Sequence, residues 1–171
     1  MLTSNQQASD QPQERRGESR KLIKELIHTR TELLSLLSRL VAFKPFEEEL
    51  DEEVQETLTE FCEILIDYTA DAHFRLYRFI DENKERRKAV LEIAESSYNK
   101  ISEITRIILD FNDRYFHDID YEESRSKQLP IKNLESDLST LAEVLAIRIQ
   151  LEDDLIEAMV KGPLNTQPAE A

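Results

Sequence analysis

Apolar residues return every three or four positions along four long stretches of this 171-residue chain, which is the spacing of an amphipathic α-helix. The first stretch runs from about Glu18 to Ala42. Pro45 ends it, because the residue before a proline is pushed out of the helical region. Its predicted buried stripe comprises Leu22, Leu26, Leu33, Leu37 and Leu40, widened by Ile23, Ile27, Leu34 and Val41.

The other three stretches predict helices of similar length. They run from about Leu50 to Asp81, from about Lys84 to Tyr115 and from about Ile131 to Lys161. The segment from Phe116 to Pro130 is expected to be a loop or a broken helix. The apolar positions predicted to face inward on these helices include Cys62, Leu91, Tyr98 and Ile147.

Amphipathic helices of this length bury their apolar stripes against one another, and an antiparallel bundle is the simplest arrangement. We therefore expect an all-α fold, an antiparallel bundle of four long helices over residues 18–161. The polar ends, residues 1–17 and 162–171, are expected to be flexible, disordered tails, the second opening with a Gly-Pro stop signal. Two glycines and five prolines supply little of the turn chemistry that an all-β fold needs.

The charge balance narrows the class of partner. With 22 Lys and Arg against 36 Asp and Glu, the formal net charge is −14. Such a surface repels nucleic-acid phosphates and anionic membranes, and it attracts a basic protein. Nine of the carboxylates fall between Glu47 and Glu63, where no Lys or Arg occurs. The helix dipole explains part of this run, and solubility alone would explain the charge of many acidic proteins.

The single cysteine, Cys62, cannot form an internal disulfide. The first residues lack an apolar signal segment, and no stretch approaches the roughly 18 continuous apolar residues of a membrane span. These features predict a cytoplasmic protein.

Catalytic and metal sites find little support in the sequence. A di-iron bundle needs two Glu-x-x-His pairs, and only Glu25 with His28 has that spacing. Cys62 lies on an apolar face and is expected to pack as a small hydrophobe. With glycine only at positions 17 and 162, no glycine-rich phosphate loop can form. We therefore expect no enzyme activity, no metal and no cofactor.

Phe74 is the residue that does not fit a purely structural pattern. On a helical wheel it lies about opposite the buried stripe, beside Asp67, Asp71 and Arg78. Another segment of the chain would cover it, or it is the apolar anchor of a protein-binding patch in which the two carboxylates select a cationic partner. His73 is expected at the edge of the apolar face, where a structural role is equally compatible with its position.

A histidine phosphotransfer bundle is an alternative, because such proteins present one exposed histidine on a four-helix bundle. His73 would be the phosphorylated residue. Leu76 and Tyr77 stand where such domains usually carry a lysine and a small residue. An acidic scaffold for some other basic protein is a further alternative.

Three stretches carry a resemblance to a known family. LIDYTADAHFRLYRF, which starts at Leu65, resembles the Asp-Tyr-x-x-x-Gly-His-Phe-x-x-Tyr signature of the Rsd/AlgQ family, the bacterial regulators of the primary sigma factor. HTRTELLSLLSRLVAFKP and LSTLAEVLAIRIQLEDDLI resemble two further helices of that family. The similarity covers most of residues 20–160, although Ala72 replaces the signature glycine. The named signature positions are occupied by Asp67, Tyr68, His73, Phe74 and Tyr77.

The resemblance implies a non-catalytic anti-sigma protein. Family members bind region four of the primary sigma factor, a basic helix-turn-helix, and block its contacts with the −35 promoter element and core RNA polymerase. This favours alternative sigma factors, typically in stationary phase, and some members also bind a sugar phosphotransfer carrier protein. The partner-binding residues expected on this basis are Asp67, Phe74, Asp71, His73 and Arg78. Tyr68 and Tyr77 are expected to be structural, and Arg30 and Arg148 to form ion pairs inside the bundle.

Overall fold

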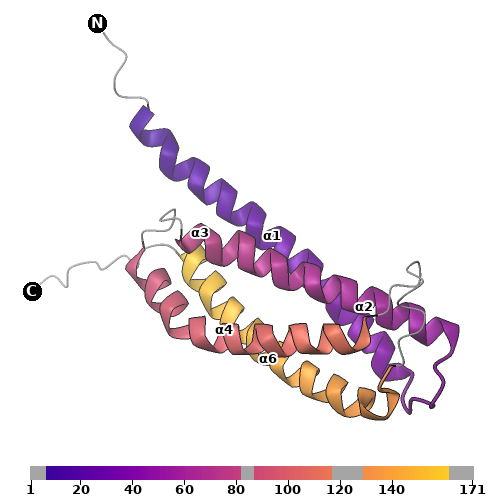
Figure 1. Cartoon of the computed structure of the whole chain (residues 1–171). Coiled ribbons are helices and arrows are strands. Elements are labelled where there is room, and N and C mark those ends of the chain that lie inside the picture. The colour runs from indigo at the N-terminus through magenta and orange to yellow at the C-terminus, as the bar shows by residue number, and fades with distance from the viewer. Residues whose placement is uncertain (1–6, 82–86, 117–128, 162–171) are drawn as a thin grey trace, which may run out of the picture.

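A computed structural model of the chain describes residues 7–81, 87–116 and 129–161, and all regular structure within them is helical. The segments α2, η1 and α3 follow one another without a break, so the described residues form four long rods (Figure 1). The prediction of an all-α bundle of four long helices is confirmed. The elements are α1 (Gln7–Ala42), α2 (Glu52–Asp71), a π-helical segment η1 (Ala72–Tyr77), α3 (Arg78–Asp81), α4 (Lys88–Tyr115) and α6 (Ile131–Lys161).

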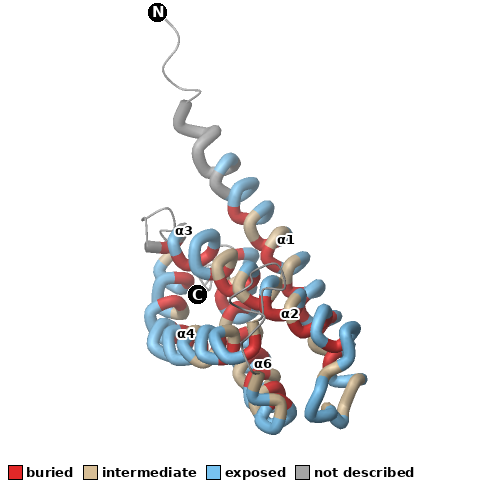
Figure 2. The backbone as a smooth tube through the Cα atoms, turned by 45° about the vertical axis from the view of Figure 1, so that its right-hand side comes forward, coloured by how far each residue is buried: buried red, intermediate tan, exposed pale blue. Residues whose placement is uncertain are grey.

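Each rod packs mainly on its neighbours in the chain. The principal contacts join α1 to α2, α2 to α4 and α4 to α6, whereas α1 and α6 touch less. The N-terminal part of α1 extends beyond the other helices, as Figures 1 and 2 both show. None of the helices in the described ranges is long and apolar enough to cross a membrane.

The helix boundaries agree with the prediction except at the start of the chain and at the start of α4, which begins at Lys88 after an extended Arg87 instead of at about Lys84. The last helix has the expected limits, whereas α1 begins at Gln7 instead of about Glu18. The sequence prediction required an apolar stripe, but Gln, Glu and Arg favour helix without burial, so the helix continues into polar residues. Residues 1–6, 82–86, 117–128 and 162–171 lie outside the described part. The predicted loop or broken helix from Phe116 to Pro130 falls almost entirely there, and the division into a bundle and two tails stays a prediction.

The core lies along the inner faces of the rods, where buried residues recur turn after turn (Figure 2). Cys62 is fully buried among apolar neighbours, as expected of a small hydrophobe. Aromatic rings join the helices, with Phe61 meeting Phe111 edge to face. The fully buried apolar side chains include Leu33, Leu40, Phe61, Leu65, Val90, Ile104, Ile108, Leu134 and Leu155.

Several apolar residues predicted to face inward are exposed. Ile27, Leu34 and Val41 on α1 keep 44%, 41% and 45% of their surface accessible. Tyr98 is 58% exposed, and Leu91 and Ile147 are also exposed. The wheel overestimated the width of the buried stripe, because each helix contacts its neighbours on only part of its circumference and residues at the flanks stay outside.

A buried polar network connects α1, α2, α4 and α6. The Arg148 guanidinium on α6 donates to Glu152 Oε1 at 2.8 Å and to Thr105 Oγ1 of α4 at 2.9 Å. Arg30 of α1 donates to Glu152 Oε2 at 3.3 Å, and the Tyr68 hydroxyl of α2 donates to the same oxygen. Glu152 therefore accepts hydrogen bonds from α1, α2 and its own helix. Arg148 extends the network to α4 through its hydrogen bond to Thr105.

The network confirms that Arg30 and Arg148 are internal ion-pair partners. Arg30 also reaches Asp153 at 2.6 Å. Burial alone would lower the Arg30 pKa, but the carboxylates of Asp153 and Glu152 outweigh it and the pKa is raised. Burial and the neighbouring Glu152 carboxylate raise the pKa of Tyr68. Its hydroxyl therefore stays protonated and donates to the carboxylate.

Candidate partner-binding face

The outer face of α2, η1 and α3 carries the residues that the sequence singled out. Phe74 lies on η1 with 59% of its surface exposed. None of the described segments covers it, so its predicted place opposite the core is confirmed. A single exposed apolar side chain is common on protein surfaces. Phe74 differs because charged residues surround it on the same face.

A row of carboxylates leads along α2 to this phenylalanine. Glu53, Glu60, Asp67 and Phe74 follow at intervals of seven residues, and all four are exposed. Seven residues make nearly two turns of α-helix, so these side chains lie close to one line on the outer face. Among the described residues, Asp67 has no ion-pair partner, and its charge faces solvent.

The π-helical turn of η1 rotates the residues around Phe74. The Arg78 amide donates to the His73 carbonyl five residues back, which is the π pattern. Because a π turn holds more residues than an α turn, each residue advances by a smaller angle, and Leu76 and Tyr77 both reach the buried side. Such bulges occur frequently at functional sites.

His73 differs from its expected place at the edge of the apolar face, because it is exposed. Its ring turns outward and meets the Phe74 ring edge to face, with the centroids 5.1 Å apart. Arg78 is also exposed, one turn beyond Phe74. The structure thus brings His73 and Phe74 into contact and sets Arg78 beside them on the same outer face.

Asp71 helps to hold α1 against α2 through hydrogen bonds. It accepts a hydrogen bond from Thr29 Oγ1 of α1 at 3.2 Å and one from Arg75 Nε at 2.9 Å. Arg75 also forms an ion pair with Glu25 of α1. The roles of Thr29, Arg75 and Glu25 could not be predicted from the sequence, since the register between two helices leaves no signal in either one alone.

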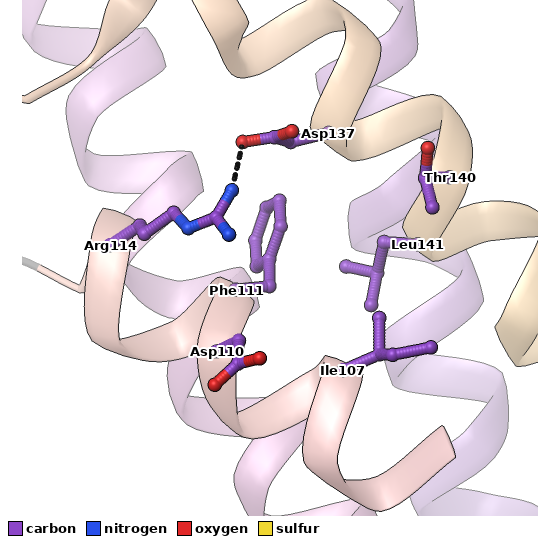
Figure 3. A pocket seen from close by; sticks show the side chains of 7 residues that line it. All are labelled: Ile107, Asp110, Phe111, Arg114, Asp137, Thr140 and Leu141. Atoms are coloured by element: carbon purple, nitrogen blue, oxygen red, sulfur yellow. Dashed lines mark hydrogen bonds and ion pairs between the residues drawn. The ribbon is translucent and has the colours of Figure 1, made fainter. Parts of the chain in front are cut away.

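Neither of the described cavities resembles a catalytic centre. A cleft of about 190 Å³ lies between α4 and α6, with Phe111, Ile107 and Leu141 as its apolar lining (Figure 3). An ion pair at 2.9 Å from Arg114 to Asp137 spans it. The second cavity, about 640 Å³, is open and lies between the α1–α2 turn and the start of α6.

The Glu-x-x-His pair lies at the surface, and its members have other partners. Glu25 is engaged by Arg75, and His28 points to Glu32 at 3.7 Å with 76% of its side chain exposed. Within the described ranges, no group of three or more His, Cys, Asp and Glu side chains is placed to hold a metal ion.

Residues 1–160 match the family described as "Regulator of RNA polymerase sigma(70) subunit, Rsd/AlgQ". A "Regulator of sigma D" from Yersinia pseudotuberculosis serotype O:1b (strain IP 31758) is 30% identical over 160 residues, covering 92% of this chain and 90% of that protein. A protein of the same name from Enterobacter sp. (strain 638) is 33% identical over 143 residues, covering 84% and 82%. No solved structure matches the chain significantly.

Proposed function

The chain belongs to the Rsd/AlgQ family of regulators of the RNA polymerase sigma(70) subunit, and we propose that it regulates transcription by binding region four of the primary sigma factor. It acts without catalysis, by occupying the surface with which that region contacts the −35 promoter element and core RNA polymerase. Alternative sigma factors then gain access to the polymerase.

The observation that carries this proposal is the exposed Phe74 at the end of the carboxylate row on α2. An exposed aromatic side chain surrounded by charged residues is typical of the centre of a protein-binding patch. Phe74 serves as the apolar anchor, and His73 supports its ring from the side.

The charge of the face supports a basic partner. Region four is expected to be a basic helix-turn-helix, and the chain carries a net charge of −14. Asp67, whose carboxylate faces solvent, accepts a hydrogen bond from an arginine or lysine of that region. Asp71 contributes negative charge while its oxygens hold α1 on α2. The row Glu53, Glu60 and Asp67 raises the rate of encounter more than the final affinity.

Calorimetric titration of the full chain with the isolated region four of its own primary sigma factor tests the proposal. At low and at moderate salt, we expect saturable one-to-one binding that weakens as salt rises. Absence of heat at both salt concentrations, with both partners folded, would contradict it.

A second titration tests whether the bound chain blocks the promoter-reading surface of region four or leaves it open. Prior saturation of region four with the chain should prevent that region from binding a −35 promoter fragment. Simultaneous binding of the DNA and the chain would show that the promoter-reading surface is left open, and the mechanism of blocking would be wrong.

A further inference from the structure

Charged residues of α1 and α2 face one another along the outer side of the contact between these two helices. We call this set the α1–α2 seam. On each helix its members recur about every two turns, so they lie on one side of that helix. On α2 the second interval is eight residues instead of seven, because the π turn of η1 holds more residues than an α turn. The seam consists of Glu25, Glu32 and Arg39 on α1 and of Glu60, Asp67 and Arg75 on the rod formed by α2 and η1.

Opposite charges meet at both ends of the seam, and these two contacts fix its register. Arg75 forms an ion pair with Glu25, and Arg39 forms one with Glu60 at 4.0 Å. From the first pair to the second, the chain advances fourteen residues on α1 and goes back fifteen residues on the opposite rod. The two rods therefore run antiparallel and stay in step along the whole seam.

The middle position of the seam carries two carboxylates and no cation. Glu32 lies halfway between the two end pairs on α1, and Asp67 lies halfway on α2, so the register sets these two exposed side chains at the same level. Within the described ranges, Asp67 has no ion-pair partner, and the contact of Glu32 is with His28 at 3.7 Å, which is charged only when protonated. Facing charges of one sign are unfavourable between helices, and such a local conflict is expected at a functional site.

The carboxylate pair lies next to the exposed phenylalanine of the candidate face. Phe74 directly precedes Arg75, which is the next seam position after Asp67. Seven residues of helix span about 10.5 Å, so the pair and the aromatic ring are about two turns apart. A basic helix laid along the seam can therefore reach the ring with an apolar side chain and the two carboxylates with a cation two of its own turns away.

We propose that Glu32 is a further partner-binding residue, which together with Asp67 holds one arginine or lysine side chain of sigma region four. This inference rests on the proposed function and extends its binding face from α2 onto α1. One guanidinium group can donate to both carboxylates. The partner thereby supplies the cation that the chain lacks at the middle of the seam, and the repulsion between the two carboxylates is compensated only in the complex.

Calorimetric titration of the full chain with isolated region four tests the role of Glu32. Glu32→Gln keeps the shape and removes the charge, and it should raise the dissociation constant about fivefold or more. In an Asp67→Asn chain the same substitution should have a smaller effect, because one remaining carboxylate no longer repays the ordering of the partner's long side chain. Glu18→Gln is the matched control, since Glu18 is exposed on the same helix about 21 Å from Glu32 and should leave the affinity unchanged.

A charge reversal in the free chain tests whether Glu32 and Asp67 face each other. Glu32→Lys supplies the missing cation from within the chain. It should raise the melting temperature by about 1–3 °C, and it should weaken the binding of region four more than Glu32→Gln does. In an Asp67→Asn chain the rise in melting temperature should be smaller, because the lysine then has no carboxylate opposite it.

The results distinguish a failure of this inference from a failure of the proposed function. Equal rises in melting temperature with and without the Asp67 carboxylate would show that the two side chains do not face each other, and would overturn the inference. Unchanged affinity of Glu32→Gln in a chain that binds region four, or strictly additive losses with Asp67→Asn, would overturn the inference alone. Absence of binding by the unmodified chain would overturn the proposed function and this inference with it.

Discussion

At the scale of single residues, Phe74 is a large apolar side chain that a partner would cover. With 59% of its surface exposed, it leaves an aromatic ring in water that a partner would desolvate. Phe74→Ala should weaken binding to sigma region four by roughly 2 kcal/mol or more, with unchanged helicity. Tyr98→Ala provides the control, because Tyr98 on α4 is an equally exposed aromatic at 58%. Equal losses of affinity in both variants, read by calorimetry, would remove Phe74 from the site.

In the proposed complex Asp67 acts by its charge, so we expect its effect in the rate of association. Asp67→Asn keeps the shape and removes the charge. It should slow association and flatten the salt dependence of the on-rate. Glu95→Gln, which removes another exposed carboxylate from α4, should change neither. Stopped-flow measurements at several salt concentrations decide this, and an unaltered slope for Asp67→Asn would assign Asp67 a structural role.

Helical periodicity predicted the orientation of some site residues better than others. It set Phe74 and Asp67 outside correctly, since both sit far from the buried stripe. It placed His73 at the edge of the buried stripe, whereas the side chain is exposed. It also could not foresee that Asp71 bonds to Thr29, which is 42 positions away in the sequence.

At the scale of elements, η1 depends on tight packing at its first residue. Ala72 is fully buried. Ala72→Gly should lower the free energy of unfolding by about 2 kcal/mol, about half from helix propensity and the rest from the lost buried methyl. Ala146→Gly on the exposed side of α6 should cost only the propensity, about 1 kcal/mol. Urea unfolding compares the two, and equal losses would mean that the buried methyl contributes nothing.

The helices themselves were largely predictable, and their ends follow local chemistry. Ile131 to Lys161 was delimited by Pro130 on one side and Gly162-Pro163 on the other, and α6 has these bounds. The N-terminal extension of α1 was missed because polar residues can continue a helix without any periodic signal.

At the scale of the whole molecule, Glu152 holds the rods in register. Its carboxylate is fully buried and serves Arg148, Arg30 and Tyr68. Glu152→Gln should destabilise the fold by about 3–5 kcal/mol, because it leaves the buried Arg148 guanidinium without a counterion and Arg30 with Asp153 alone. Glu157→Gln, an exposed residue of the same helix paired with Lys161, should leave the unfolding midpoint nearly unchanged. Indistinguishable unfolding curves would show that the network adds specificity without stability.

Alkaline pH should also lower the free energy of unfolding of the bundle. Burial, with a smaller contribution from Glu152, raises the pKa of Tyr77 from 10.0 to about 12. Above pH 10 the unfolded chain releases the phenolic proton while the folded chain keeps it, so stability is full below pH 10 and falls as pH rises toward 12. Tyr77→Phe should make this decline shallower in thermal unfolding measured across that interval. A decline of the same steepness would assign the loss to other groups.

The sequence by itself determined the four amphipathic helices, their all-α packing, the acidic charge and the outward position of Phe74, because periodicity and charge are local properties of the chain. The tertiary structure alone decided which flanks of each helix are covered, that Glu152 accepts hydrogen bonds from three helices, and that η1 brings both Leu76 and Tyr77 to the buried side. These features depend on contacts between residues far apart in sequence. The spacing within one helix carries no information about the register of the next.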